Sequence, residues 1–108
     1  MRFRTVPVAP ERRYDWALSL EVGEHIPAQY EDVFLDNLDR HNAVGVVLSW
    51  AVPGQGGHGH VNERDNDHVR RQMAARGYRS DHETERRLRG VARLPWFRDT
   101  LMVFRRET

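Results

Sequence analysis

Two carboxylates and one imidazole stand close together in the first quarter of the chain. Glu21, Glu24 and His25 fall within five residues, at the end of a strongly apolar run. Carboxylate oxygens and an imidazole nitrogen together suit a hard or borderline divalent cation such as Mg²⁺ or Mn²⁺. His25 has a second possible role as a general base, because an unperturbed imidazole titrates near ~6.5. These residue types therefore indicate a metal site or acid–base chemistry at this point.

An apolar strand is needed to present these side chains. Residues 16–22 are nearly continuously apolar, which is typical of a strand buried on both faces. Pro27 suits the first turn of a helix, and helical spacing of apolar residues predicts that helix over residues 28–41. A second apolar strand spans residues 44–50. Strand, helix and strand form a parallel crossover unit, so an α/β fold is predicted.

The rest of the chain supplies a loop, two helices and a last strand. Residues 53–60 contain four glycines, and loops at the carboxyl ends of parallel strands are where α/β proteins bind ligands. Asp65 or Asn66 predicts the start of a helix over residues 66–76. Ser80 and Glu83 predict a capping box at the start of a third helix, which is expected to bury Leu88, Val91 and Leu94 and to end at Pro95. After it, Trp96 and Phe97 are expected to close the core, and a last strand is expected over residues 100–104.

The order of these elements, with two motifs, resembles a known family. Residues 14–27, Tyr-Asp-Trp-Ala-Leu-Ser-Leu-Glu-Val-Gly-Glu-His-Ile-Pro, resemble the fourth strand and following loop of class I S-adenosylmethionine-dependent methyltransferases, many of which carry Glu-x-x-Glu-His-x-Pro. Residues 45–49 resemble their fifth strand, Gly77-Tyr78 the turn into the sixth, and residues 101–106 the antiparallel seventh. The resemblance implies a partial Rossmann-like sheet, with parallel strands plus an antiparallel final strand. It also implies a single domain over residues 1–108, methyltransferase-like from about residue 14.

The family's N-terminal half has no counterpart in this sequence. That half carries a glycine-rich loop and an acidic residue that bind S-adenosylmethionine, and 13 residues precede Tyr14 here. The resemblance therefore implies methyl transfer to an unknown acceptor if a missing N-terminal half is supplied, for example by another chain. Ser19, Leu20 and Glu21 would then contact the cofactor. The alternative is a non-catalytic remnant that acts as a binding or dimerisation module.

Two branches of this family bind a metal with the same spacing: the small-RNA 2′-O-methyltransferases and the ubiquinone-pathway O-methyltransferases. In the former, a further histidine follows the fifth strand, and His60 or His58 has that position here. The resemblance thus implies Mg²⁺ or Mn²⁺ held by Glu21, Glu24, His25 and His60. Many other members with this motif bind no metal: their glutamates cap the next helix and their histidine lines the pocket. Both interpretations stay open.

Three residues after the second strand are expected to contact the acceptor, namely Trp50, Pro53 and His58. Trp50 has a second interpretation, since a tryptophan at a strand end more often closes the core. The histidines near the helix ends, His41, His68 and His82, are expected to face solvent.

Composition narrows the remaining function classes. The net charge of +1 does not indicate nucleic acid, and the absence of cysteine excludes disulfides and thiol catalysis. The longest apolar run, residues 43–52, is too short for a membrane span. No signal-peptide pattern follows Met1, so a cytoplasmic location is expected. An apolar first strand without the family's neighbouring strand predicts a homodimer, or else a fold-back strand from residues 3–8.

Overall fold

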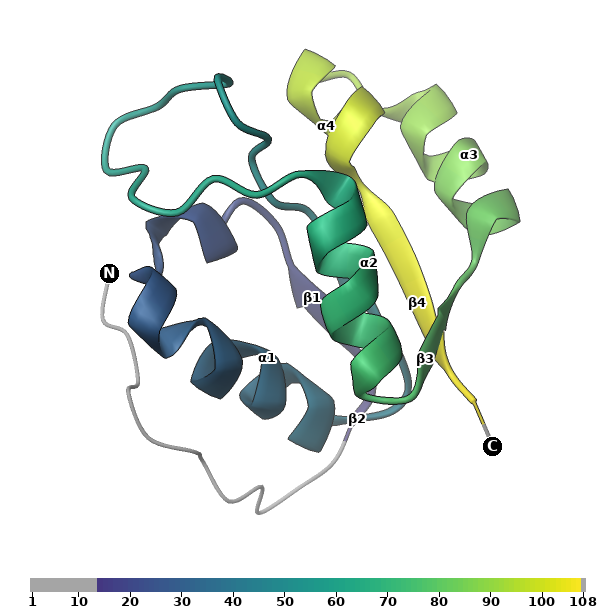
Figure 1. The fold of residues 1–108 in the computed structure, drawn as a ribbon. Helices are drawn as coiled ribbons and strands as arrows, with labels where there is room; N and C mark the ends of the chain where they lie inside the picture. Colours follow the sequence, from purple (N-terminus) through teal and green to yellow (C-terminus); the bar gives the residue numbers. More distant parts are fainter. Residues whose placement is uncertain (1–13, 108) are drawn as a thin grey trace.

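The computed structural model describes residues 14–107, and its centre is a mixed four-stranded sheet in the order β1-β2-β4-β3 (Figure 1). The strands are β1 (Tyr14–Ser19), β2 (Asn42–Leu48), β3 (Tyr78–Ser80) and β4 (Met102–Arg106). β1 and β2 are parallel, and β4 is antiparallel to both of its neighbours. The predicted α/β class and the antiparallel last strand are therefore confirmed.

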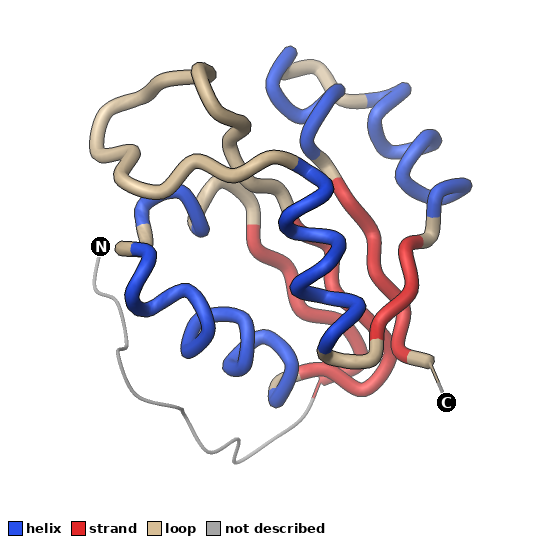
Figure 2. Tube along the Cα trace, in the orientation of Figure 1, coloured by secondary structure: helices blue, strands red, loops and turns tan. Residues whose placement is uncertain are grey.

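The helices lie between the strands in chain order. α1 (Glu31–Arg40) connects β1 to β2, and α2 (Asn66–Ala75) connects β2 to β3 after a long loop that arches over one end of the sheet (Figure 2). α3 (His82–Val91) and α4 (Pro95–Thr100) connect β3 to β4. None of the helices within residues 14–107 is long and apolar enough to cross a membrane.

The first strand is shorter than the apolar run that predicts it. β1 ends at Ser19, because Glu21 turns the backbone with a φ of 55° and the 3₁₀ turn η1 (Gly23–His25) follows. A second 3₁₀ turn, η2 (Ala28–Tyr30), then leads into α1. After α1, Asn42 starts β2, and its buried side-chain amide donates to the Leu38 carbonyl oxygen.

The core lies on one face of the sheet, under α1 and α2 (Figure 1). Alternate residues of a strand point to the same face. Val46 and Leu48 of β2 therefore join Met102 and Phe104 of β4 in this layer. The two helices, the segment after β2 and the start of β3 complete the buried cluster with Leu35, Trp50, Val69, Met73 and Tyr78.

The start and end of α2 match the sequence signals. The carboxylate of Asp65 accepts a hydrogen bond from the backbone N–H of His68 at 2.7 Å, which is an N-cap. Gly77, with a φ of 89°, turns the chain into β3. A side chain at that φ would be strained, so the glycine is needed here.

The prediction for α3 was wrong in two respects. Its N-cap is Asp81, which accepts from the Thr84 N–H, so the expected Ser80–Glu83 capping box does not form. The helix buries Glu85, whereas Val91 is 76% exposed and Leu94 is 44% exposed. Two hydrogen bonds from Arg70 and one from the backbone N–H of Val103 satisfy the Glu85 carboxylate.

Pro95 begins a new helix, α4, rather than only ending the previous one. Proline suits the first turn of a helix, because the N–H groups there have no acceptor within the helix and the one that proline lacks costs no hydrogen bond. Trp96 on α4 is 41% exposed, so its expected role in closing the core is not seen. The apolar side chains of Val91, Leu94 and Trp96 are therefore exposed, and the buried contact of α3 is the carboxylate of Glu85.

Burial on both faces was expected for the first strand and is also wrong. On β1, Tyr14 is 55%, Trp16 39% and Leu18 68% exposed. β1 is an edge strand, with β2 on one side and no strand on the other within residues 14–107. The fold-back strand expected from residues 3–8 lies outside the described residues.

Candidate functional site

The candidate site is formed where the segment after β1 meets the loop after β2. Both strands are parallel, so their carboxyl ends share one edge of the sheet. The carbonyl oxygen of Glu24 accepts from the backbone N–H groups of Val61 and Asn62, at 2.9 and 3.0 Å. The Ser49 N–H donates to the carbonyl oxygen of Ser19 at 2.9 Å. These bonds hold residues that are far apart in sequence in a fixed arrangement.

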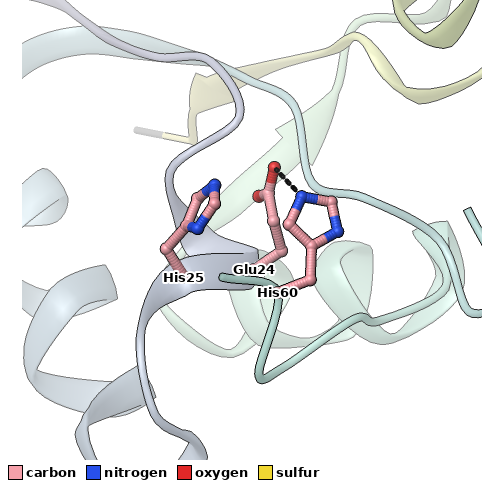
Figure 3. Close-up of side chains that lie close together, drawn as sticks. All are labelled: Glu24, His25 and His60. Carbon is pink, nitrogen blue, oxygen red and sulfur yellow. Dashed lines mark ion pairs between the residues drawn. The ribbon is translucent and has the colours of Figure 1, made fainter. Parts of the chain in front are cut away.

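Glu24 is the most unusual side chain of this region. It is 0% exposed, and no donor among the described residues reaches either of its carboxylate oxygens. Burying a carboxylate without partners costs several kcal/mol, so such groups normally bind a cation or keep a proton. The group nearest to it by ion-pair geometry is the His60 imidazole, whose Nε2 lies 3.9 Å from Oε1 (Figure 3).

His25 and His60 lie beside Glu24, so that one ligand atom of each of the three residues lies within 4.8 Å of the others. The two rings meet edge to face, with centroids 4.9 Å apart (Figure 3). His25 Nδ1 contacts the Gly59 carbonyl oxygen at 3.0 Å, and His60 Nδ1 contacts Glu63 Oε2 at 2.9 Å.

These contacts determine which nitrogen of each ring has a free lone pair. An oxygen acceptor at Nδ1 requires the ring proton there, which leaves Nε2 as the free electron-pair donor in each neutral imidazole. Oxygen partners of this kind orient histidine ligands in metal sites. The hydrogen bond from His60 also lowers the pKa of Glu63, and the backbone N–H groups of Gly56 and Gly54 add to this effect.

Glu21 adjoins the three-residue group without belonging to it. It is the one residue other than glycine with a positive φ in the described part of the chain, and its N–H donates to Ser49 Oγ. Burial raises its pKa to about 7, the adjacent Glu24 carboxylate adds to the increase, and Gln55 and His60 oppose it. Glu21 therefore keeps its proton to a higher pH than an ordinary glutamate does, next to the Glu24 carboxylate.

A hydrogen-bond cluster around Glu31, which the sequence did not suggest, fixes the loop that carries His60. The buried carboxylate of Glu31 accepts from Asn62, Arg64 and His68 at 2.9, 3.0 and 2.8 Å. Burial raises the pKa of Glu31, but these three hydrogen bonds outweigh it and the net pKa is lowered. His68 was expected to face solvent, and this contact corrects that expectation. No local spacing pattern links residue 31 to residues 62–68.

The expected cofactor residues lie at the carboxyl end of β1. Ser19 is its last residue, and its buried hydroxyl has no hydrogen-bond partner within residues 14–107. Leu20 is half-buried and leads directly to Glu21. This is the edge of a parallel sheet at which α/β proteins bind ligands.

The three expected acceptor residues differ in burial. Trp50 is 1% exposed and packs edge to face on Phe34, while its indole N–H donates to the Asn62 carbonyl oxygen at 2.7 Å. This burial agrees with its second interpretation, closing the core. Pro53 and His58 are exposed on the loop. A pocket in the same loop is lined by Gly56, Gly57, His60, Val61, Asn62 and Glu63.

Comparison with solved structures identifies a similar fold. The magnesium protoporphyrin IX methyltransferase ChlM from Synechocystis PCC 6803, crystallised with bound SAH, matches with a TM-score of 0.64 at 15% sequence identity. The match covers 91% of this chain and 47% of that chain, so this chain spans about half the length of ChlM. Neither models of known protein families nor curated protein sequences give a match. The fold of this chain thus resembles about half of that methyltransferase structure.

Proposed function

We propose that this chain is the acceptor-side half of a metal-dependent S-adenosylmethionine methyltransferase domain. The observation that carries the proposal is the buried, unpartnered carboxylate of Glu24 between two oriented imidazoles. It lies at the ligand-binding edge of a methyltransferase-like half-sheet. ChlM was crystallised with SAH, and by analogy an S-adenosylmethionine-type cofactor is proposed here.

The residues present fit a divalent cation. Glu24 offers two oxygens that no protein donor occupies, and His25 and His60 each offer a free Nε2. Glu21 interacts with Glu24 and His60 but lies outside this three-residue group, and it is proposed as a further carboxylate ligand once it loses its proton. Oxygen and imidazole ligands in this number suit Mg²⁺ or Mn²⁺. A bound cation would act as a Lewis acid that lowers the pKa of an acceptor hydroxyl.

The protein's own groups divide the remaining work. Ser19, Leu20 and Glu21 border the cofactor side of the site, with the Ser19 hydroxyl available as a hydrogen-bonding group. Glu31 holds the His60 loop through Asn62, which keeps His60 close to Glu24. His25 acts as a ligand in this arrangement. Its role as a general base is the alternative, since the same Nε2 lone pair could accept a proton from the acceptor.

A second candidate function is a non-catalytic binding or dimerisation module. The exposed apolar side chains of β1 favour it, because a large apolar patch on a sheet edge marks an interaction surface. The two functions differ in one measurable property. A module of this kind has no need for a vacant buried carboxylate, so it predicts no specific cation binding.

Titration calorimetry with Mn²⁺ tests the proposal on the 108-residue chain. We expect one Mn²⁺ per chain and at least a tenfold loss of affinity in Glu24→Gln and His60→Ala. His58→Ala is the matched control, because His58 lies on the same loop but is exposed, and its affinity should equal that of the wild type. Equal Mn²⁺ affinity in all four proteins would contradict the metal site.

A second titration, with SAH, tests the cofactor part. The isolated chain should bind SAH weakly or not at all, because half of the cofactor pocket has to come from elsewhere. Micromolar binding by the isolated chain would mean that these 108 residues form a complete pocket, which would contradict the half-domain proposal.

A further inference from the structure

The backbone of the loop after β2 lies directly against the two imidazoles of the candidate site. A Cβ atom on Gly57 would lie only 2.6 Å from Cε1 and Nε2 of His60, and one on Gly59 would lie 3.2 Å from Nδ1 of His25. Because 2.6 Å is far inside the normal contact distance of carbon atoms, no larger residue fits at Gly57 while His60 keeps its place. We call residues 54–60, which contain four glycines, the glycine loop.

Glu63 joins the glycine loop to His60 with a single carboxylate. Its Oε2 accepts from the backbone N–H of Gly56 at 2.8 Å and from Nδ1 of His60 at 2.9 Å. Its Oε1 accepts from the backbone N–H of Gly54 at 3.0 Å. A carboxylate at the second nitrogen of a histidine ligand sets the orientation of the ring. Glu63 therefore fixes the direction of the free Nε2 of His60 and the start of the loop together.

The same loop holds the second imidazole from its other end. Nδ1 of His25 contacts the carbonyl oxygen of Gly59 at 3.0 Å, and the rings of His25 and His60 meet edge to face (Figure 3). Each candidate histidine ligand is thus bonded to the glycine loop, one directly and one through Glu63. The loop also supplies Gly56 and Gly57 to the lining of the pocket beside His60. One loop conformation therefore determines both the direction of the ligand atoms and the shape of that pocket.

We propose that Glu63 is a positioning residue that couples cation binding to the conformation of the glycine loop. The inference rests on the proposed function, because the cation concerned is the one assigned to Glu24, His25 and His60. When the two histidines hold a cation through Nε2, their rings are fixed, and their Nδ1 atoms hold Glu63 and Gly59 in place. The pocket lined by the glycine loop then has its complete shape in the cation-loaded protein, so the cation binds before the acceptor.

The coupling makes a quantitative demand that a purely structural role does not make. Loss of the partner that orients a histidine ligand lowers metal affinity by about tenfold. Linkage is reciprocal, so a saturating cation must slow the opening of the glycine loop by the same factor, about tenfold. A Glu63 that only stabilised the fold would change the melting temperature without relating these two factors.

Hydrogen exchange and calorimetry on the 108-residue chain test the proposal, with Mn²⁺ as the probe. In the wild type, the amides of Gly54 and Gly56 should exchange about tenfold more slowly in saturating Mn²⁺ than in EDTA. Glu63→Ala should bind Mn²⁺ about tenfold more weakly, and its loop should exchange equally fast in both conditions. Asp67→Ala is the matched control, because it removes an exposed carboxylate four residues further along and should behave as the wild type does.

A pair of glycine variants tests the contact with His60 separately from backbone strain. Gly57→Ala places a methyl group against the His60 ring and should lower Mn²⁺ affinity about tenfold. Gly56→Ala is the control, because the φ of Gly56 is 74° and strains any side chain, yet its added Cβ would meet no atom of the described residues within 4 Å. Its Mn²⁺ affinity should stay close to that of the wild type, and equal losses in the two variants would contradict coupling through His60.

The outcomes separate this inference from the proposed function. Mn²⁺ that binds the wild type without slowing exchange in the glycine loop overturns the coupling and leaves the metal site standing. Equal slowing in wild type and Glu63→Ala also overturns it, because the loop would then respond without Glu63. A wild type that binds no Mn²⁺ contradicts the metal site and the coupling together. The amides of α2, measured in the same spectra, report on unfolding of the whole chain, so a general loss of stability is recognised as such.

Discussion

Two buried glutamates near the same loop have opposite surroundings. Glu31 is 6% exposed and accepts hydrogen bonds from an amide, a guanidinium and an imidazole. Glu24 is 0% exposed and accepts none from residues 14–107. Each faces one histidine: His68, in α2, lies 2.8 Å from Glu31, whereas His60, in the loop before α2, lies 3.9 Å from Glu24.

The difference separates a structural carboxylate from a candidate ligand. A buried carboxylate with a full set of donors is stabilised in its charged form and ties its neighbours together. A buried carboxylate without donors has a cost that only a proton or a cation removes. Glu31 therefore fixes the position of the loop, whereas Glu24 is the candidate ligand for a group that binds between the loop and β1.

The largest effect is expected from removing the structural carboxylate. Glu31→Ala leaves Asn62, Arg64 and His68 without their shared acceptor, which should lower the free energy of unfolding by about 3 kcal/mol. Urea denaturation measures this loss. The control is Asp32→Ala, one residue along α1, whose 80% exposed side chain pairs with Arg76 at the surface. That change should cost below about 0.5 kcal/mol, and an equal loss in both variants would contradict the assigned role of Glu31.

Mn²⁺ should distinguish the two glutamates next. A ligand that binds only the folded state stabilises it by about 2.7 kcal/mol at a hundredfold excess over its Kd. Wild type and Glu31→Gln should both show a rise in Tm with Mn²⁺, and Glu24→Gln should show none. A rise that persists in Glu24→Gln but disappears in Glu31→Gln would exchange the two roles.

Sequence patterns predicted the parts of the fold that depend on neighbouring residues. Apolar runs indicated β1 and β2, Asp65 indicated the N-cap of α2, and Gly77 its end. The Ser80 and Glu83 pair misled, because Asp81 at the adjacent position caps the helix by accepting from the Thr84 N–H. The apolar run predicted β1 as a strand correctly, but its expected burial on both faces was wrong, because Trp16 and Leu18 are exposed. It could not show that the described residues leave one face of that strand uncovered.

The site was also predictable only in part, because sequence patterns report on residues that are close together in the chain. Glu21, Glu24 and His25 are close in sequence, so their proximity follows from local spacing. His60 required a resemblance to a known family, since it comes from a different loop. The Glu31 cluster could not be predicted, because its partners lie more than 30 residues away and only the completed crossover brings them together.

Without metal, neutralising Glu24 should be favourable. Glu24→Gln replaces a buried carboxyl group that has no hydrogen-bond partner among the described residues with an uncharged amide of the same shape. We expect the free energy of unfolding in EDTA to rise by about 1–2 kcal/mol. The matched Glu31→Gln change should lower it, because an amide cannot pair with both Arg64 and His68 as a carboxylate does. Opposite signs for the two variants support the comparison, and a loss of stability in both would contradict it.

The smallest effect is expected from Glu21, and it depends on pH. Its pKa is about 7 in the folded protein, raised from 4.5 by burial and by Glu24. As pH rises from about 4.5 to 7, the unfolded chain releases this proton before the folded chain does, so Glu21 progressively destabilises the fold over that window. Glu21→Gln cannot ionise, so its Tm in EDTA should exceed that of the wild type by about 5 °C at pH 8, which corresponds to roughly 1 kcal/mol once the pKa shift is discounted for partial exposure. At pH 5 the two melting temperatures should nearly coincide.

Glu63→Gln is the control for this prediction, because the pKa of Glu63 is lowered by His60 and Gly56, so this variant should gain no stability at pH 8. Parallel Tm curves for wild type and Glu21→Gln from pH 5 to 8 would show that Glu21 titrates as an ordinary surface carboxylate, and that Glu24 lacks the acidic neighbour proposed for the site.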